Sequence, residues 1–82
     1  MKTTSDSLRA QCERAGLRVL LTDEVDSEVC AQILDIEERT LRGWRQQGYG
    51  PPWRPQRQRR LYALSDIAVW MDRQRQEVAD RG

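Results

Sequence analysis

The sequence predicts a single, mainly α-helical domain with one small β-hairpin, and three observations support this. With 82 residues, the chain has room for one domain. Apolar residues recur at helical spacing in four segments that are separated by Gly, Asp or Pro. Between the third and fourth segments, Gly50-Pro51-Pro52 excludes a helix, and a basic stretch leads into the apolar residues 61–63.

The first predicted helix lies near the amino terminus. Ser5 or Asp6 can cap it, because a short polar side chain accepts a hydrogen bond from a free N–H of the first turn. Leu8 and Cys12 are four residues apart, so they share one face of this helix. Gly16 supplies the stop.

A second helix is expected to begin at Thr22 or Asp23, after a short apolar run at residues 19–21 that is extended or a packed linker. Acidic residues in its first turns suit the positive end of the helix dipole. Its buried face would consist of Val25, Val29, Cys30, Ile33 and Leu34.

A tight turn is expected at residues 35–37, where the apolar pattern breaks before Leu41 and Trp44 resume it. Asp tolerates the left-handed backbone that such turns use. The third helix should span about residues 37–47 and end at Gly48. Two helices joined in this way, the second rich in Arg, form a helix-turn-helix.

The hairpin is expected to consist of two short strands, residues 53–54 and 60–63, around a turn at residues 55–58. Ser65 should then cap a fourth helix. The buried side of that helix would carry Ile67, Trp70, Met71 and Val78.

Positive charge is concentrated in residues 38–62. This segment holds seven arginines, no lysine and one acid, whereas the whole chain has a net charge of only +1. Residues 1–37 hold four basic and eight acidic side chains. Because Arg pairs bidentately with phosphate and with guanine, the segregation indicates a surface for a polyanion.

The composition offers little for catalysis or metal binding. The chain has no His, and its two cysteines, Cys12 and Cys30, lack metal-ligand spacing and are expected to be buried free thiols, which suits a reducing cytoplasm. No apolar run approaches the roughly 20 residues of a membrane span, and the first ten residues lack a signal-peptide core. We therefore expect a cytoplasmic, non-enzymatic protein without cofactor, metal, small-molecule ligand or membrane partner.

Four motifs occur in a characteristic order: LDI at residues 34–36, EERTLRGW at 37–44, GYGPP at 48–52 and SDIAVWM at 65–71. Together they resemble the MerR-like winged helix-turn-helix proteins of the AlpA and excisionase type. In that family a Gly stands at the position of Asp35 and a Ser at the position of Glu37. The resemblance implies a winged helix-turn-helix domain at residues 20–72. Residues 1–19, expected to form a helical extension, and residues 73–82, expected to form a polar tail, have no clear counterpart in the family.

The resemblance also implies how the domain binds double-stranded DNA, with the third helix in the major groove and the hairpin as a basic wing. The recognition-helix contacts would be Arg39, Thr40, Arg42, Arg45 and Gln46. The wing contacts would be Arg54, Arg57, Arg59 and Arg60. Leu41, Trp44, Ile67 and Trp70 would form the structural core. Trp53 is expected to pack in the core or to stack on a sugar, with the core favoured.

The function that the resemblance implies is that of a recombination directionality factor of a phage or integrative element. Such a protein binds attachment-site DNA cooperatively, with head-to-tail self-association, and assists an integrase in excision. A small AlpA-type transcriptional regulator is the close alternative. A protein-interaction adaptor whose arginines face acidic protein is a third, from a different class.

Overall fold

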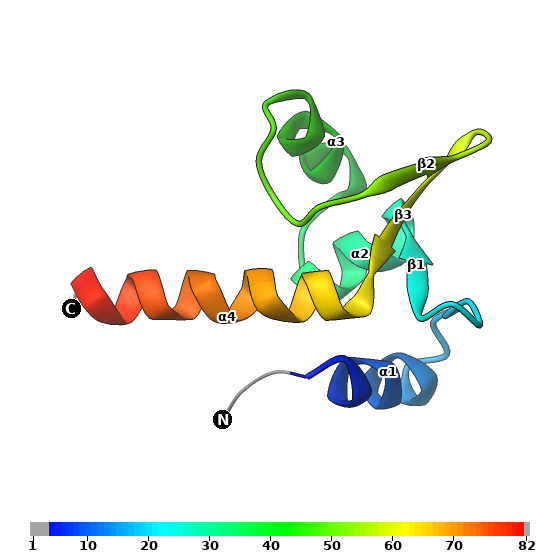
Figure 1. The fold of residues 1–82 in the computed structure, drawn as a ribbon, viewed down its shortest axis with the longest axis horizontal. Coiled ribbons are helices and arrows are strands. Elements are labelled where there is room, and N and C mark those ends of the chain that lie inside the picture. The colour runs from blue at the N-terminus through cyan, green and yellow to red at the C-terminus, as the bar shows by residue number, and fades with distance from the viewer. Residues whose placement is uncertain (1–3, 82) are drawn as a thin grey trace.

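The structure, a computed structural model, describes the backbone of residues 4–81 and the side chains of residues 4–76. Its elements in chain order are α1 (Ser5–Arg14), β1 (Glu24–Asp26), α2 (Ser27–Leu34), α3 (Glu38–Gln46), β2 (Arg54–Gln56), β3 (Arg59–Ala63) and α4 (Leu64–Arg81). In Figure 1, α4 runs along the long axis of the molecule, with α1 on one side and α3 on the other. The β2–β3 hairpin projects away from the helices.

The first helix begins and ends close to where the sequence predicts. The cap is Thr4, one residue before Ser5, and its hydroxyl accepts a hydrogen bond from the Ser7 N–H at 3.1 Å. At the other end Gly16 adopts a φ of +74°, and the Leu17 N–H donates to the Cys12 carbonyl at 2.8 Å. Such a left-handed glycine with a backward hydrogen bond satisfies the last carbonyls of a helix.

The prediction of a helix from Thr22 or Asp23 is wrong, because this segment forms strand β1. Asp23 has a φ of +61°, which reverses the chain before the strand. Val25 pairs with Tyr62 of β3, and the Asp26 carboxylate then caps α2 by accepting from the Val29 N–H at 3.0 Å. Pairing with a strand distant in the chain overrides the local helical pattern here.

The turn and the third helix match the sequence prediction within one residue. Asp35 has a φ of +58°, and the Ile36 N–H donates to the Ala31 carbonyl at 3.0 Å. Helix α3 follows at once, with Glu37 at its cap position but without a side-chain hydrogen bond to the helix. Gly48, at a φ of +71°, ends the helix.

The wing is a two-stranded hairpin whose loop consists of Arg57 and Gln58. The sheet order is β1-β3-β2, so β2 is an edge strand and tolerates Pro55, which has no N–H to donate. After β3, helix α4 begins at Leu64, so Ser65 lies inside its first turn rather than at its cap.

Helix α4 continues through residue 81, so most of the predicted polar tail, residues 73–82, prolongs the helix. The side chain of Val78, predicted on the buried side, lies outside the described side chains. Within the described part of the chain, no helix combines the length and apolar character of a membrane span.

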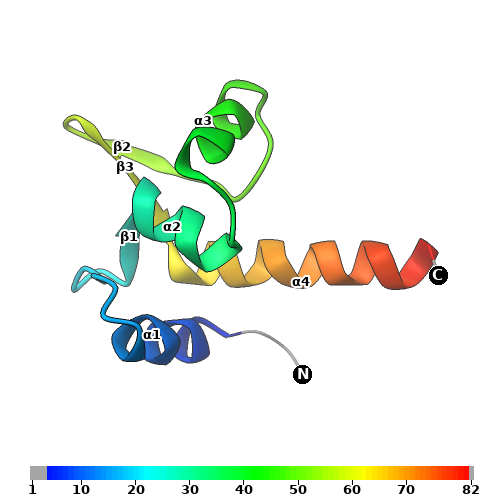
Figure 2. The same ribbon diagram turned by 180° about the vertical axis from the view of Figure 1, so that it is seen from behind.

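The core lies where α2 packs against α3 and the sheet, and where α1 packs against α4. Figure 2 shows α2 between β1 and α3.

Cys12 and Cys30 are free and buried, and burial raises the pKa of the Cys30 thiol to about 12. Among the described residues, the largest fully buried side chains are Tyr62, Leu41, Leu61, Leu64, Ile67, Val25, Cys12 and Cys30. The predicted fold class, a single winged helix-turn-helix domain, is confirmed.

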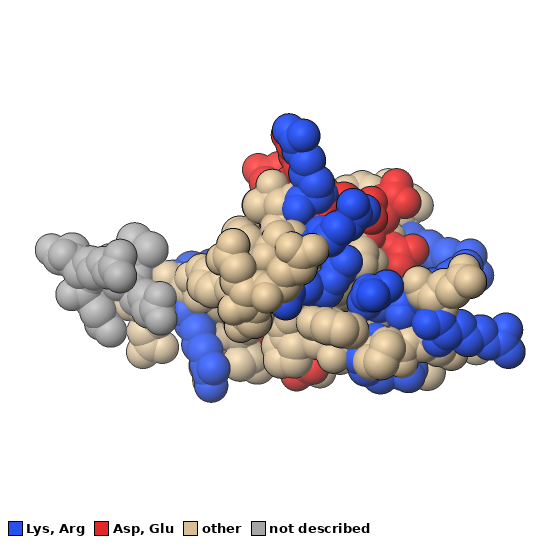
Figure 3. All heavy atoms as spheres, turned by 90° about the horizontal axis from the view of Figure 1, so that it is seen from above, with Lys and Arg blue, Asp and Glu red and all other residues tan. Residues whose placement is uncertain are grey.

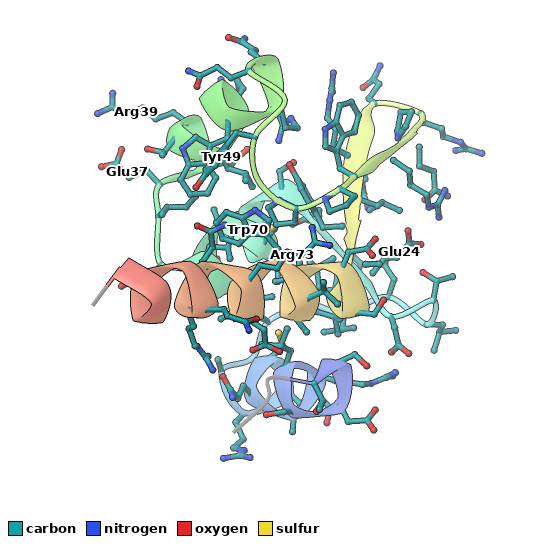
Figure 4. The ribbon with its side chains drawn as sticks, turned by 60° about the vertical axis from the view of Figure 1, so that its left-hand side comes forward. Glu24, Glu37, Arg39, Tyr49, Trp70 and Arg73 are labelled. Atoms are coloured by element: carbon teal, nitrogen blue, oxygen red, sulfur yellow. The ribbon has the colours of Figure 1, made fainter. Side chains whose placement is uncertain are left out.

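Trp44 and Trp70 differ from the predicted core because both are only half-buried. Their ring centroids are 5.6 Å apart, and Tyr49 packs edge-on against each of them. Figure 4 shows Tyr49 and Trp70 between α3 and α4. The three rings form an aromatic cluster beside the core, whereas Leu41 and Ile67 are fully buried.

Candidate nucleic-acid interface

Helix α3 has one buried face and one open face. At about 100° per residue, Arg39, Arg42 and Gln46 lie on the side opposite to Leu41. Leu41 is completely buried, whereas all three polar side chains are exposed. The helix therefore presents basic and amide groups outward while its apolar side holds it against the core.

A cleft separates α3 from the wing, and arginines from both elements line it. Its two adjoining cavities each have a volume of about 310 Å³, and Arg42, Arg45 and Arg60 line both. In Figure 3, Arg side chains gather over α3 and along the hairpin, with acidic side chains beside them. The fold thus joins the two halves of the basic segment into one surface.

Arg45 is the arginine of this cleft that the fold holds most firmly. Its Nη1 donates to the Ser27 hydroxyl at 3.0 Å and to the Tyr62 hydroxyl at 3.2 Å. Tyr62 is fully buried, and burial raises the pKa of its phenol although the nearby guanidinium opposes the rise. Arg45 is therefore positioned by the core. Its side chain carries five N–H donors, and these two hydrogen bonds use two of them.

Carboxylates occupy one end of the cleft. Asp26, Glu28 and Glu38 line it there together with Arg42. The Glu38 carboxylate is 3.8 Å from the Arg42 guanidinium, and both side chains are substantially exposed. Because an exposed pair of this kind is weak, Arg42 can leave Glu38 at little cost when a ligand approaches.

Two of the predicted recognition-helix residues lie away from the cleft. Arg39 projects from the side of α3 that faces away from the hairpin (Figure 4), where its Nε donates to Glu37 at 2.9 Å. Thr40 is exposed on the same helix but does not line the cleft. Arg42, Arg45 and Gln46 do line it.

The four wing arginines also divide into groups. Arg57, at a φ of +55° in the hairpin loop, and Arg59 beside it are exposed. The Arg60 guanidinium lies over the Trp53 ring, 5.8 Å from its centroid, and faces α3. Arg54 instead turns toward β1 and pairs with Glu24.

Sequence reasoning missed the pairing of Arg54 with Glu24 and the position of Trp53. Glu24 is buried, with 8% of its surface exposed, whereas Trp53 is 41% exposed and lines the cleft. The predicted preference of Trp53 for the core is therefore wrong. Nothing local marks either residue, because both environments depend on how β1 and β2 flank β3.

Comparison with known proteins agrees with this architecture. Searches of curated proteins and of solved structures found no match to the chain. A family model described as a helix-turn-helix domain matches residues 27–75, which is more than half of the chain and includes α2, α3, the wing and the first part of α4. The chain therefore belongs to this helix-turn-helix domain family and contains its DNA-binding domain.

Proposed function

We propose that α3 enters the major groove of double-stranded DNA while the wing follows the adjoining backbone toward the minor groove. The observation that carries this proposal is the arginine-lined cleft between α3 and the hairpin. A duplex presents its phosphates on both sides of each groove, so a protein with basic groups on two neighbouring elements can hold it at both. A charged surface that only contacts solvent would not require arginines from two elements to line the same cleft.

Within this docking, Arg42 and Gln46 are the base-reading residues, because both lie on the open face of α3 and line the cleft. Arg reads guanine and Gln reads adenine by paired hydrogen bonds in the major groove. Arg39 and Thr40 would contact the flank of the groove remote from the wing. Arg45, fixed by Ser27 and Tyr62, would hold a phosphate.

Arg57 and Arg59 would hold phosphates at the tip of the wing, and Arg60 would do so near its base. Arg54 receives a different role, since its guanidinium already binds the Glu24 carboxylate. It would orient the wing. The finer resemblance to MerR-like proteins of the AlpA and excisionase type supports the same use of helix and wing.

The biological role that we infer is that of a recombination directionality factor. Copies bound side by side on attachment-site DNA would bend it and present it to an integrase, without cutting the DNA themselves. The chain supplies no His, and both of its cysteines are buried, so its groups suit binding better than phosphoryl transfer. Bending a site by 40–90° costs on the order of 1–6 kcal/mol, which cooperative copies can provide together.

An excision assay with the cognate integrase tests this role. As the protein is titrated in, excision should rise steeply rather than hyperbolically, and integration should fall. The variant with both Arg42 and Gln46 changed to Ala should lose this effect, whereas Arg73→Ala, an exposed arginine on α4, should retain it. If excision does not respond but a nearby promoter does, the protein is a transcriptional regulator. If the protein binds no duplex at all, the adaptor role replaces both.

A further inference from the structure

Trp53 is a large aromatic side chain that the fold leaves in the cleft instead of the core. It follows Pro51 and Pro52, which fix the backbone just before β2, and 41% of its surface is exposed. Arg60 from the facing strand lies over its ring. A partly exposed Trp on a rigid segment provides a flat apolar surface at little entropic cost.

The two ends of the cleft differ in charge. The end near the amino terminus of α2 is lined by three carboxylates, Asp26, Glu28 and Glu38, as well as by arginines. The other end is lined by Arg42, Arg45, Gln46, Trp53 and Arg60, and none of these five residues is acidic. The lining of the Trp53 end carries three arginines and no acid, whereas four arginines and three carboxylates line the other end, so a phosphate is attracted more strongly to the Trp53 end.

We infer that the sugar–phosphate backbone crosses the cleft at the Trp53 end, with a deoxyribose against the indole ring and a phosphate between Arg45 and Arg60. This inference rests on the proposed DNA binding. It says where one DNA strand lies: the strand between the major groove, which α3 reads, and the minor groove, which the wing reaches, passes through the Trp53 end of the cleft. The strand must pass between helix and wing, and only this end of the cleft offers cations without carboxylates.

Arg45 and Arg60 are held in the site in different ways. Arg45 is held by Ser27 and Tyr62, so its guanidinium is in place before DNA arrives. Arg60 is placed over the Trp53 ring, and a cation in that position is stabilised by the electron-rich ring face. Loss of the indole therefore removes the sugar contact and also releases Arg60.

Binding of random-sequence duplex, measured by fluorescence anisotropy, tests the site. Trp53→Ala should weaken binding at least about fivefold, as truncation of a central aromatic contact does. Leu21→Ala, the truncation of a side chain that is 96% exposed and outside the cleft, should leave it unchanged. If the wild type binds duplex and Trp53→Ala binds equally well, the site is wrong although the proposed function stands. A wild type that binds no duplex fails the proposed function itself.

Neutralising the acidic end gives an independent check. Glu28→Gln should change the affinity for random duplex no more than Asp6→Asn does, a change of the same charge on exposed α1. A much larger gain for Glu28→Gln would show that phosphates pass over the acidic end, which would overturn the inference.

Two further measurements test the sugar contact, and the second separates it from stacking on an unpaired base. The indole N–H resonance of Trp53, identified as the one missing from the spectrum of Trp53→Phe, should shift on addition of duplex. The affinity lost in Trp53→Ala should be greater for duplex than for the matching single strand. A greater loss for the single strand would indicate base stacking and would contradict the sugar contact.

Discussion

Glu24 on β1 and Arg54 on β2 are joined across the central strand β3 by two hydrogen bonds. The Arg54 Nε donates to Oε2 at 2.5 Å and its Nη2 to Oε1 at 2.7 Å, while the Thr22 hydroxyl donates to Oε1 at 2.8 Å. Hydrogen bonding by Arg54, and secondly by Thr22, holds the pKa of the Glu24 carboxyl below its ordinary value. Because β1 belongs to the body and β2 to the wing, the pair fixes the wing at its base.

Removal of this charge should lower stability in a way that depends on pH. A carboxyl whose pKa is lowered by folding stabilises the protein above the pKa of the unfolded chain, about 4.3, and ceases to do so as the pH falls through the lower, folded value. Glu24→Gln should therefore lower the Tm at neutral pH. The difference in Tm between wild type and variant should stay constant down to about pH 5 and shrink in stronger acid.

The same variant should loosen the wing. Amide hydrogen exchange in β2 should accelerate in Glu24→Gln, and exchange in α1 should remain as in the wild type unless global stability controls it. Glu28→Gln is the matched control, since Glu28 is exposed and, among the described residues, makes no hydrogen bond or ion pair with β2. A Tm difference that is constant from pH 7 to pH 2 would show that the charge of Glu24 contributes nothing.

Gly43, in the middle of α3, should reveal how closely DNA approaches the helix. A Cβ added there would meet nothing within 4 Å, so the protein itself has room for a methyl group. Gly43→Ala should raise stability by about 0.5–1 kcal/mol, because Gly disfavours a helix interior. We expect it also to weaken binding to the preferred DNA site, since this position lies on the open face. Gln32→Ala, on exposed α2 surface, is the control for both urea unfolding and DNA titration.

Truncation of Leu41 should cost more than truncation of Trp70. Leu41 is fully buried, and removal of a buried leucine side chain costs about 2–5 kcal/mol, a large part of the roughly 5–15 kcal/mol available to a small domain. Trp70 is half-buried in the aromatic cluster with Trp44 and Tyr49, so part of its surface is already hydrated. Urea unfolding of Leu41→Ala and Trp70→Ala measures the order, and a larger loss for Trp70→Ala would contradict it.

The parts of the fold that the sequence predicts are those coded by neighbouring residues. The α2–α3 turn follows from Asp35 and the resumed apolar spacing at Leu41, and the end of α3 follows from Gly48. Strand β1 was not predictable in this way, because three residues are too short a run to establish a strand pattern and their partner strand lies more than thirty residues away. A strand defined by its neighbour leaves little trace in its own sequence.

The candidate site shows the same division. Its basic character is evident from the Arg count alone, but the use of each arginine depends on tertiary contacts. Arg54 turns to Glu24 and Arg45 turns to Tyr62, and both partners are distant in the chain. The docking roles of the recognition-helix and wing residues remain predictions that the sequence and the geometry motivate together.

The last prediction separates the wing tip from the recognition helix. Arg57 and Arg59 are exposed in and beside the hairpin loop, so the contacts open to them are with phosphates, which carry no base identity. Changing both to Ala should weaken binding to every sequence and flatten the plot of log affinity against log salt by about two units. Arg42→Ala should instead cost about 1–3 kcal/mol on the preferred site and much less on random DNA, because the lost contact is with a base edge. Titration of both DNAs over a range of salt concentrations measures the two effects together. Equal losses on both DNAs for the wing-tip variant and for Arg42→Ala would show that helix and wing share one non-specific role, and the base-reading assignment of Arg42 would then be wrong.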